Sequence, residues 1–131
     1  MMAAYWPTPE PIKNDPITAG KMNSLTKIVF SKTLKNAAWQ NTTLIKEDVA
    51  GEVKKLKAQP GKDILVLGSG SIVAYLTEMD MVDEFRIIVN PIILGDGKPQ
   101  FNKNLTRKLL KLTDIRQLNS GVVILYYQTI K

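Results

Sequence analysis

Four small residues in the middle of the chain have the types and spacing that can bind a phosphate. They follow the apolar run Ile64–Leu67 and precede apolar residues at helical spacing that start at Ile72. The four are Gly68, Ser69, Gly70 and Ser71. Glycine lets a ligand approach the backbone closely, and the first turn of a helix offers N–H groups and the positive end of its dipole. A lone G-x-G also makes a plain tight corner, so the turn alone leaves both interpretations equally open.

A second group of phosphate-binding types follows the apolar run at Lys27–Ser31. It consists of Ser31, Lys32 and Thr33, which together offer one positive charge and two hydroxyl groups. Charge-assisted hydrogen bonds of this kind hold phosphates well. The residues by themselves favour the simpler alternative, a solvated exit from a strand.

Histidine and cysteine are both absent from the 131 residues. Their absence excludes Ser-His triads, thiol nucleophiles, disulfides and the usual zinc sites. Acid–base chemistry must therefore come from carboxylates, Tyr, Lys or a cofactor. Asp96 and Tyr75 are the candidate proton donors, but a structural role is favoured for each. The sequence assigns no catalytic residue and no metal ligands.

The net charge of +6 favours anionic partners, and it comes from 15 Lys and 3 Arg. Nucleic-acid binders usually add Arg and aromatic residues, so we expect no nucleic-acid partner. Polyanion binding through the basic segment 98–111 is a weaker alternative to a solvated surface whose leucines turn inward. No apolar run approaches the roughly 20 residues that span a bilayer, and no signal peptide is evident. We therefore expect no membrane partner and a cytoplasmic location.

The first 24 residues form a proline-rich lead-in. Pro7, Pro9 and Pro11 predict an extended segment, and Asp15-Pro16 predicts the start of a short helix that ends near Met22. Apolar runs then predict strands at 27–31, 42–46, 64–67 and 84–89. Helices are expected from Asp48, ending before Pro60-Gly61, and over about 71–79.

The spacing of strand 64–67, helix 71–79 and strand 84–89 predicts a βαβ unit with parallel strands. Two apolar runs around Asn119-Ser120-Gly121 predict an antiparallel hairpin. The expected fold class is therefore α/β. A mixed, mostly parallel sheet would be flanked by helices and would end in the C-terminal antiparallel hairpin. The length of the chain predicts a single domain over 1–131.

The order of these segments resembles one known family. The segments are "KIVFSKTL", Trp39, "DILVLGSGSIVAYL", "MVDEFRIIVNPIILGDGKPQF" and "SGVVILYYQ". From about Tyr5 to the C-terminus they are similar to the dihydrofolate-reductase-like superfamily. Within it they resemble the reductase (C-terminal) domain of the bifunctional riboflavin-biosynthesis deaminase/reductase.

This resemblance implies an NADPH-dependent reductase acting on a small heterocyclic substrate by hydride transfer. The implied cofactor-binding residues are Ser31, Lys32, Thr33, Gly68, Ser69, Gly70, Ser71 and Ile72. In the family the glycine turn holds the cofactor diphosphate, and the strand exit at Lys32 meets the 2′-phosphate of NADPH. The implied substrate pocket includes Leu67, Pro91, Leu94 and Gly95.

The sequence departs from the family in two places. The family's first strands, with a Gly-Arg-x-Thr type motif, should precede "AAYWPTPEP", so this chain is expected to be a partial domain. Exposed apolar surface would then favour a homo-oligomer, most simply a dimer. Leu67 stands where true riboflavin-pathway reductases usually carry an acidic residue, so a different substrate is expected. A non-catalytic, self-associating remnant of the fold is the alternative.

Overall fold

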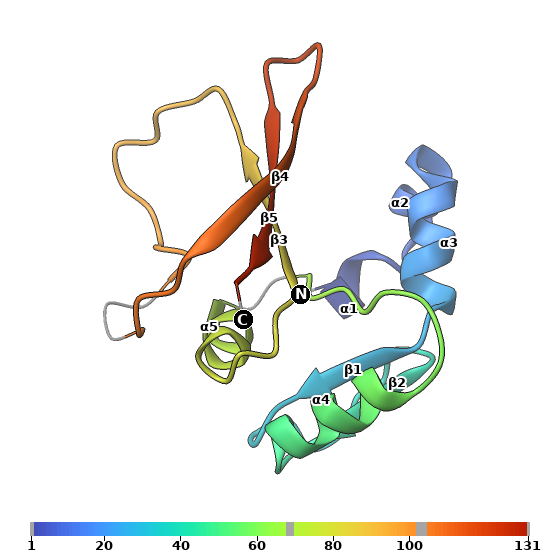
Figure 1. Ribbon diagram of the computed structural model, residues 1–131. Coiled ribbons are helices and arrows are strands. Elements are labelled where there is room, and N and C mark those ends of the chain that lie inside the picture. The colour runs from blue at the N-terminus through green and yellow to red at the C-terminus, as the bar shows by residue number, and fades with distance from the viewer. Residues whose placement is uncertain (1, 68–69, 102–104, 131) are drawn as a thin grey trace. The chain divides into compact units, whose positions relative to one another are not determined.

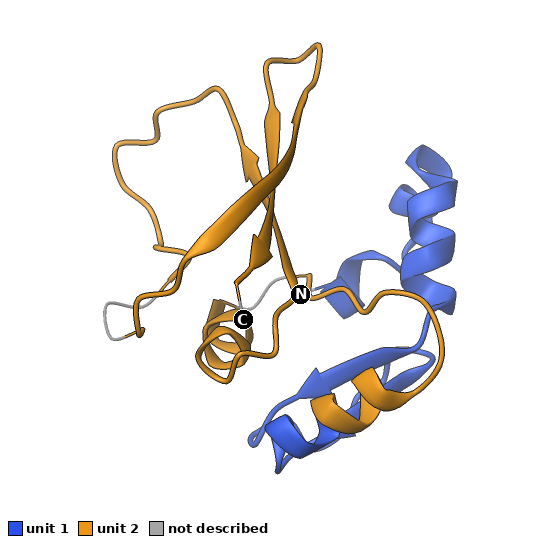
Figure 2. Cartoon of the chain, viewed as in Figure 1, with its two compact units in different colours: residues 1–52 blue, residues 53–131 orange. Residues whose placement is uncertain are grey.

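The chain forms two compact units, residues 1–52 and 53–131 (Figures 1 and 2). The computed structural model describes residues 2–67, 70–101 and 105–130. Its helices are α1 (Met2–Tyr5), α2 (Pro9–Asn14), α3 (Pro16–Ser24), α4 (Val49–Ala58) and α5 (Gly70–Glu78). Its strands are β1 (Lys27–Phe30), β2 (Thr42–Ile45), β3 (Glu84–Val89), β4 (Leu110–Gln117) and β5 (Val123–Thr129). Among the described residues, every helix is too short or too polar to cross a membrane.

The lead-in of the first unit is helical, so the extended segment predicted there is wrong. Pro9 and Pro11 fall in the first turn of α2, where a helix has no acceptor for the missing N–H group. The short helix predicted to start at Asp15-Pro16 is present as α3. Asp15 precedes Pro16, and its carboxylate accepts a hydrogen bond from the Thr18 N–H at 3.2 Å. Pro11 and Ala19 are the buried residues of this helical pair.

Strands β1 and β2 pair in parallel, with Lys27 opposite Thr42 and Phe30 opposite Ile45. Both strands were predicted from their apolar runs. The helix predicted after Asp48 is α4, and the Asp48 carboxylate accepts a hydrogen bond from the Gly51 N–H at 3.2 Å. Asp48 has a positive φ of 53°. A Cβ at Gly51 would collide with that carboxylate, so a side chain at position 51 would displace the cap.

Asn23 joins three parts of the first unit. Its side-chain NH₂ donates to the Trp6 and Ala19 carbonyl oxygens at 3.0 and 2.9 Å. Its side-chain oxygen accepts from the Trp39 indole N–H at 2.8 Å. One amide therefore fixes the α1 end, helix α3 and the segment before β2 with three hydrogen bonds.

The Lys27 ammonium caps the end of α3. It donates to the Met22, Asn23 and Leu25 carbonyl oxygens at 2.9, 2.9 and 3.0 Å. It also lies 4.4 Å from the centre of the Trp39 ring. A cation at a helix C-terminus satisfies carbonyls that have no partner within the helix. Desolvation lowers the pKa of this lysine below its ordinary value.

The second unit contains a three-stranded antiparallel sheet in the order β3-β5-β4. The hairpin predicted around 119–121 is formed by β4 and β5, and Gly121 occupies a positive φ of 90° in its turn. The strand predicted at 84–89 is β3. The α/β class and the C-terminal antiparallel hairpin are thus confirmed, and parallel pairing is found between β1 and β2.

The strand predicted at Ile64–Leu67 does not form in the structure. These four side chains are 44–63% exposed, and no ladder joins them to β3, whose partner within the described residues is β5. Two parallel strands can pair only across a long crossover connection. The ladders that this unit forms, in the order β3-β5-β4, are antiparallel instead. The parallel βαβ unit expected from the spacing is therefore absent from the part of the chain that the structure describes.

The sheet register separates an apolar face from a charged face. Phe85, Tyr127 and Leu112 are cross-strand partners, and so are Ile87, Leu125 and Ile115. Successive residues alternate between faces, so Arg86, Tyr126 and Asp114 lie on the other side. Phe85 is buried and packs edge to face against Phe101, with ring centres 5.9 Å apart.

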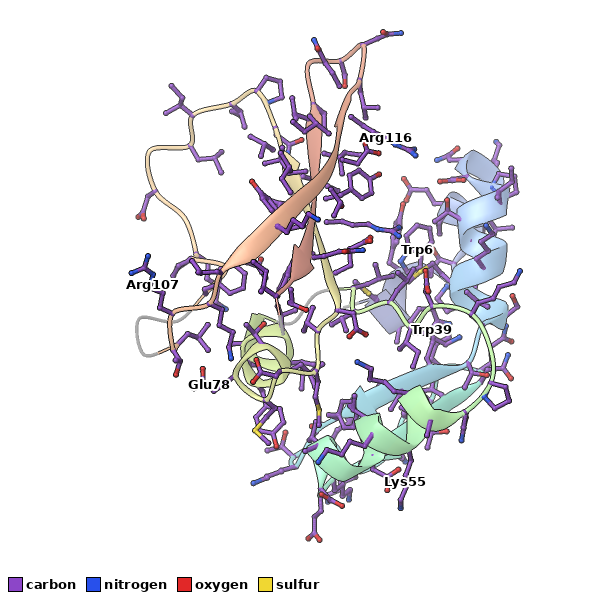
Figure 3. All side chains as sticks on the ribbon, in the orientation of Figure 1. Trp6, Trp39, Lys55, Glu78, Arg107 and Arg116 are labelled. Atoms are coloured by element: carbon purple, nitrogen blue, oxygen red, sulfur yellow. The ribbon has the colours of Figure 1, made fainter. Side chains whose placement is uncertain are left out.

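Glu78 at the end of α5 fixes the segment that leads into β4 (Figure 3). Its carboxylate accepts the Thr106 hydroxyl at 2.6 Å and the Thr106 N–H at 3.0 Å. Hydrogen bonds to the charged form lower the pKa of Glu78, the hydroxyl bond most strongly.

We expect Thr106→Val to raise the pKa of Glu78 toward its ordinary value, as measured by NMR titration of the side-chain carboxyl. Because the folded-state pKa is depressed, this contact stabilises the fold above the unfolded-state pKa. That contribution is lost as the pH falls through the folded-state pKa. Thr113→Val is the control, since the Thr113 hydroxyl donates to the Tyr126 carbonyl oxygen and not to a carboxylate. An unchanged Glu78 pKa in Thr106→Val would contradict the assignment.

Candidate functional site

The glycine turn leads into α5, which begins at Gly70. Ser71 and Ile72 follow in the first helical turn, at the end of the helix where the dipole is positive. Among the described residues, the nearest atom to a Cβ added at Gly70 is the Gln100 carbonyl oxygen at 3.9 Å, so these residues leave room for a ligand beside the backbone there. Gly68 and Ser69 lie outside the described residues. The described part of the turn therefore has the features that an anion site needs.

The second predicted group, Ser31–Thr33, follows β1 in the first unit. The Ser31 N–H continues the parallel ladder by donating to the Ile45 carbonyl oxygen at 3.1 Å. Its hydroxyl oxygen accepts the Leu34 N–H at 3.1 Å and lies 3.5 Å from the Thr33 hydroxyl. Lys32 is exposed. The two hydroxyl groups thus lie together in a tight turn, and the lysine is accessible to an anion.

The residues predicted to line a substrate pocket lie on exposed segments of the second unit. Leu67 is half-exposed, and Leu94 is 75% exposed in the long connection after β3. Pro91 packs near Gly121, whose added Cβ would lie 3.3 Å from the proline ring. Gly95 has a positive φ of 79°, which favours glycine at this turn. The structure places Pro91, Leu94 and Gly95 on one connection and Leu67 on a separate segment.

Both candidate proton donors have surface positions. Asp96 accepts a hydrogen bond from the Gly97 N–H at 2.7 Å, which stabilises the loop. Tyr75 lies on α5 and is exposed.

Two cavities lie away from the predicted residues. One, of about 320 Å³, is lined in the second unit by Thr77, Asp80, Val82, Arg107, Lys108, Leu109, Thr129 and Ile130. The other, of about 650 Å³, lies in the first unit beside Trp39. Neither is lined by a residue predicted to bind the cofactor or the substrate, although three residues of the basic segment 98–111, Arg107, Lys108 and Leu109, line the first. In that cavity the Lys108 ammonium pairs with Asp80 at 2.7 Å.

The basic segment 98–111 is partly neutralised by acidic residues. Lys108 pairs with Asp80, and Thr106 is bound by Glu78. Leu109, Leu110 and Leu112 are exposed, so the inward orientation expected for the leucines of this segment is wrong at those positions. Every residue of β4, which begins at Leu110, is exposed. Paired charges weaken the segment as a polyanion site.

Comparison with known proteins gives a consistent assignment. The RibD C-terminal domain profile matches residues 1–124. The uncharacterised YyaP protein of Bacillus subtilis (strain 168) is 37% identical over 121 residues, which cover 89% of this chain and 64% of YyaP. YwjB, another uncharacterised protein of that strain, is 30% identical over 87 residues, covering 66% of this chain and 50% of YwjB.

Two solved structures share the fold. A putative riboflavin biosynthesis protein from Shewanella sp. PV-4 superposes with a TM-score of 0.71 at 21% identity, covering 82% of this chain and 62% of that one. A pyrimidine reductase-like protein from Corynebacterium diphtheriae gives a TM-score of 0.60 at 18% identity, covering 79% and 50%. The chain thus spans about half to two-thirds of the length of the relatives it matches.

Proposed function

Because this chain belongs to the RibD C-terminal domain family, a family of reductase domains, we propose that it is an NADPH-dependent reductase of a small heterocyclic compound. The observation that carries the proposal is the open start of α5. Gly70 leaves the backbone accessible, and the helix dipole favours an anion at that end. A dinucleotide diphosphate has the charge and the oxygen acceptors that this position requires.

The residues of the described turn fit a diphosphate. The N–H groups of a first helical turn would donate to phosphate oxygens, and among the described residues the nearest atom to an added Cβ at Gly70 is 3.9 Å away. When bound, NADPH supplies a hydride to a C=O or C=N carbon of the substrate, which also gains a proton. The absence of His and Cys agrees with a reaction in which the cofactor carries the difficult step.

The family resemblance assigns the 2′-phosphate of NADPH to Ser31–Thr33. The exposed Lys32 offers a positive charge, and the neighbouring hydroxyl groups can donate hydrogen bonds. Under this assignment the chain is expected to bind NADPH more tightly than NADH, because NADH lacks the 2′-phosphate. Leu67 in place of an acidic residue supports a substrate other than the riboflavin-pathway pyrimidine.

A titration with NADPH tests the proposal through the fluorescence of Trp6 and Trp39. We expect saturable quenching with a Kd below about 1 mM. Lys32→Gln should weaken NADPH binding about tenfold and leave NADH binding unchanged, since one charge-assisted hydrogen bond contributes about 1.5–3 kcal/mol.

Lys35→Gln is the matched control, because Lys35 is an exposed lysine three residues further along with the same charge. It should bind NADPH as the unaltered protein does. A flat response of the unaltered protein to both dinucleotides would overturn the reductase proposal and favour the non-catalytic, self-associating alternative. An equal loss in the two lysine variants would contradict the specific role of Lys32.

A further inference from the structure

The cavity of about 650 Å³ in the first unit has the size of an ordinary small-molecule site, which is roughly 300–1,000 Å³. Its wall comes from α1, α2, α3 and the connections that follow α1 and precede β2. Among the described residues no charged side chain lines it, and its apolar part consists of Ala3, Pro7, Ile12 and Ala38. A charged ligand group would lose water there without gaining a partner of opposite charge. The lining therefore favours an uncharged ligand.

The Trp39 ring is the aromatic part of this wall, and two contacts hold it in place (Figure 3). Its indole N–H donates to the Asn23 side-chain oxygen at 2.8 Å, and the Lys27 ammonium lies 4.4 Å from the ring centre. A ring that is already fixed loses little conformational entropy when a ligand packs against it. Aromatic pairs also contribute more than the area they bury. This part of the wall therefore suits a planar ring.

The Gln40 side-chain oxygen is the acceptor that the lining residues offer to a ligand. The Asn23 amide and the Lys27 ammonium already make three hydrogen bonds each. The Gln40 side-chain NH₂ donates to the Asn23 backbone carbonyl oxygen at 2.8 Å, which orients the Gln40 amide. Its oxygen has no donor among the described residues. A ligand that bonds to this oxygen must supply an N–H or O–H group.

The cavity lies at the other end of β1 from the residues predicted to meet the cofactor. Ser31 follows the carboxyl end of β1, whereas Lys27 begins the strand and lies against Trp39. The Lys27 N–H also donates to the Asn41 carbonyl oxygen, next to Gln40, at 2.8 Å. At roughly 3.3 Å per residue, Lys27 and Ser31 are about 13 Å apart. The cavity is therefore separate from the position proposed for the 2′-phosphate of NADPH.

We propose that this cavity binds an uncharged, planar heterocycle that carries a ring N–H. The ligand packs against the Trp39 ring and the apolar wall, and its N–H donates to the Gln40 side-chain oxygen. Bicyclic lactams and neutral nucleobases have these features. Binding does not require NADPH, so this site goes beyond the cofactor site proposed above.

The indole N–H resonance of Trp39 tests the proposal by NMR, with the bicyclic lactam carbostyril as the probe. Trp6→Phe leaves a single indole resonance and so assigns it. We expect carbostyril to shift this resonance saturably, with a Kd of about 1 mM. N-methylcarbostyril, which lacks the N–H, should bind about fivefold more weakly. A carboxylated carbostyril should bind at least about tenfold more weakly, because the cavity offers its charge no partner.

Gln40→Leu isolates the proposed hydrogen bond. It should weaken the binding of carbostyril about fivefold and leave the binding of N-methylcarbostyril unchanged, since the second probe does not use the amide oxygen. Gln59→Leu is the matched control, because Gln59 is an exposed glutamine of the second unit, and it should bind both probes as the unaltered chain does. Ala38→Phe places a ring at an exposed position of the wall and should abolish the binding of both probes without changing the urea midpoint of unfolding.

Two results would overturn the proposal. One is a Trp39 resonance that does not move in carbostyril up to about 10 mM, and the other is equal affinity of Gln40→Leu and the unaltered chain for carbostyril. The titration with NADPH is a separate measurement. A chain that binds NADPH but not carbostyril would contradict this inference alone, and a chain that binds carbostyril but not NADPH would contradict the reductase proposal alone.

Discussion

Gly70→Asp is expected to weaken NADPH binding by about 100-fold, which corresponds to about 2.8 kcal/mol. The new carboxylate would lie at the start of α5, where we place the cofactor diphosphate. Like charges a few ångströms apart repel by about 1–4 kcal/mol in a partly solvated site. The same carboxylate interacts favourably with the helix dipole, so the thermal stability should be unchanged or slightly higher. The affinity for NADPH is therefore expected to fall while the thermal stability stays the same or rises slightly.

Two further variants show whether this loss is specific. Gly70→Ala adds a methyl group whose nearest neighbour is 3.9 Å away, so it should fold normally and weaken binding by only a few-fold. Ser120→Asp adds the same charge at the β4–β5 turn, at the opposite end of the second unit from α5 (Figure 1), and should bind NADPH normally. Equal affinity of Gly70→Asp and the unaltered chain, measured by fluorescence titration, would show that the diphosphate binds elsewhere.

Asn23→Leu is expected to lower the free energy of unfolding of the first unit by about 2–4 kcal/mol. Leucine has a similar size but cannot replace the three hydrogen bonds to Trp6, Ala19 and Trp39. Two carbonyl oxygens and one indole N–H would lose their partner in a half-buried environment. Both tryptophans of the chain belong to this unit, so urea unfolding followed by tryptophan fluorescence reports its stability directly.

Asn36→Leu is the matched control for this measurement. Asn36 is exposed in the connection between β1 and β2, so its replacement should change the unfolding free energy by less than about 0.5 kcal/mol. The indole emission of Trp39 should shift in Asn23→Leu and stay constant in the control. Similar unfolding midpoints for both variants would contradict the proposed role of Asn23.

Local patterns predicted most of the elements correctly. The apolar runs at β1, β2 and β3, the Asp15 and Asp48 caps and the glycine turn of the hairpin each carry their own signal in a few residues. Two of the errors, at the lead-in and at 64–67, have different causes. Pro9 and Pro11 were interpreted as helix breakers although they occupy a first turn. Ile64–Leu67 has the composition of a buried strand, but composition does not specify a partner for pairing.

The candidate site was predictable only in part. Small residues before a helix are compatible with both an anion site and a plain corner, and α5 does begin within that turn. Loop residues such as Leu94 carry no periodic signal, so their place in a pocket came from the resemblance alone.

The cap of α4 has a consequence for how this chain can vary. Asp48 reaches over position 51 from a left-handed backbone conformation, and any side chain larger than hydrogen there would displace its carboxylate. A side chain at position 51 would therefore cost the cap hydrogen bond from the Gly51 N–H, about 1 kcal/mol, and that cost is absent once Asp48 has been replaced. The effects of substitutions at positions 48 and 51 on stability should therefore be coupled rather than additive.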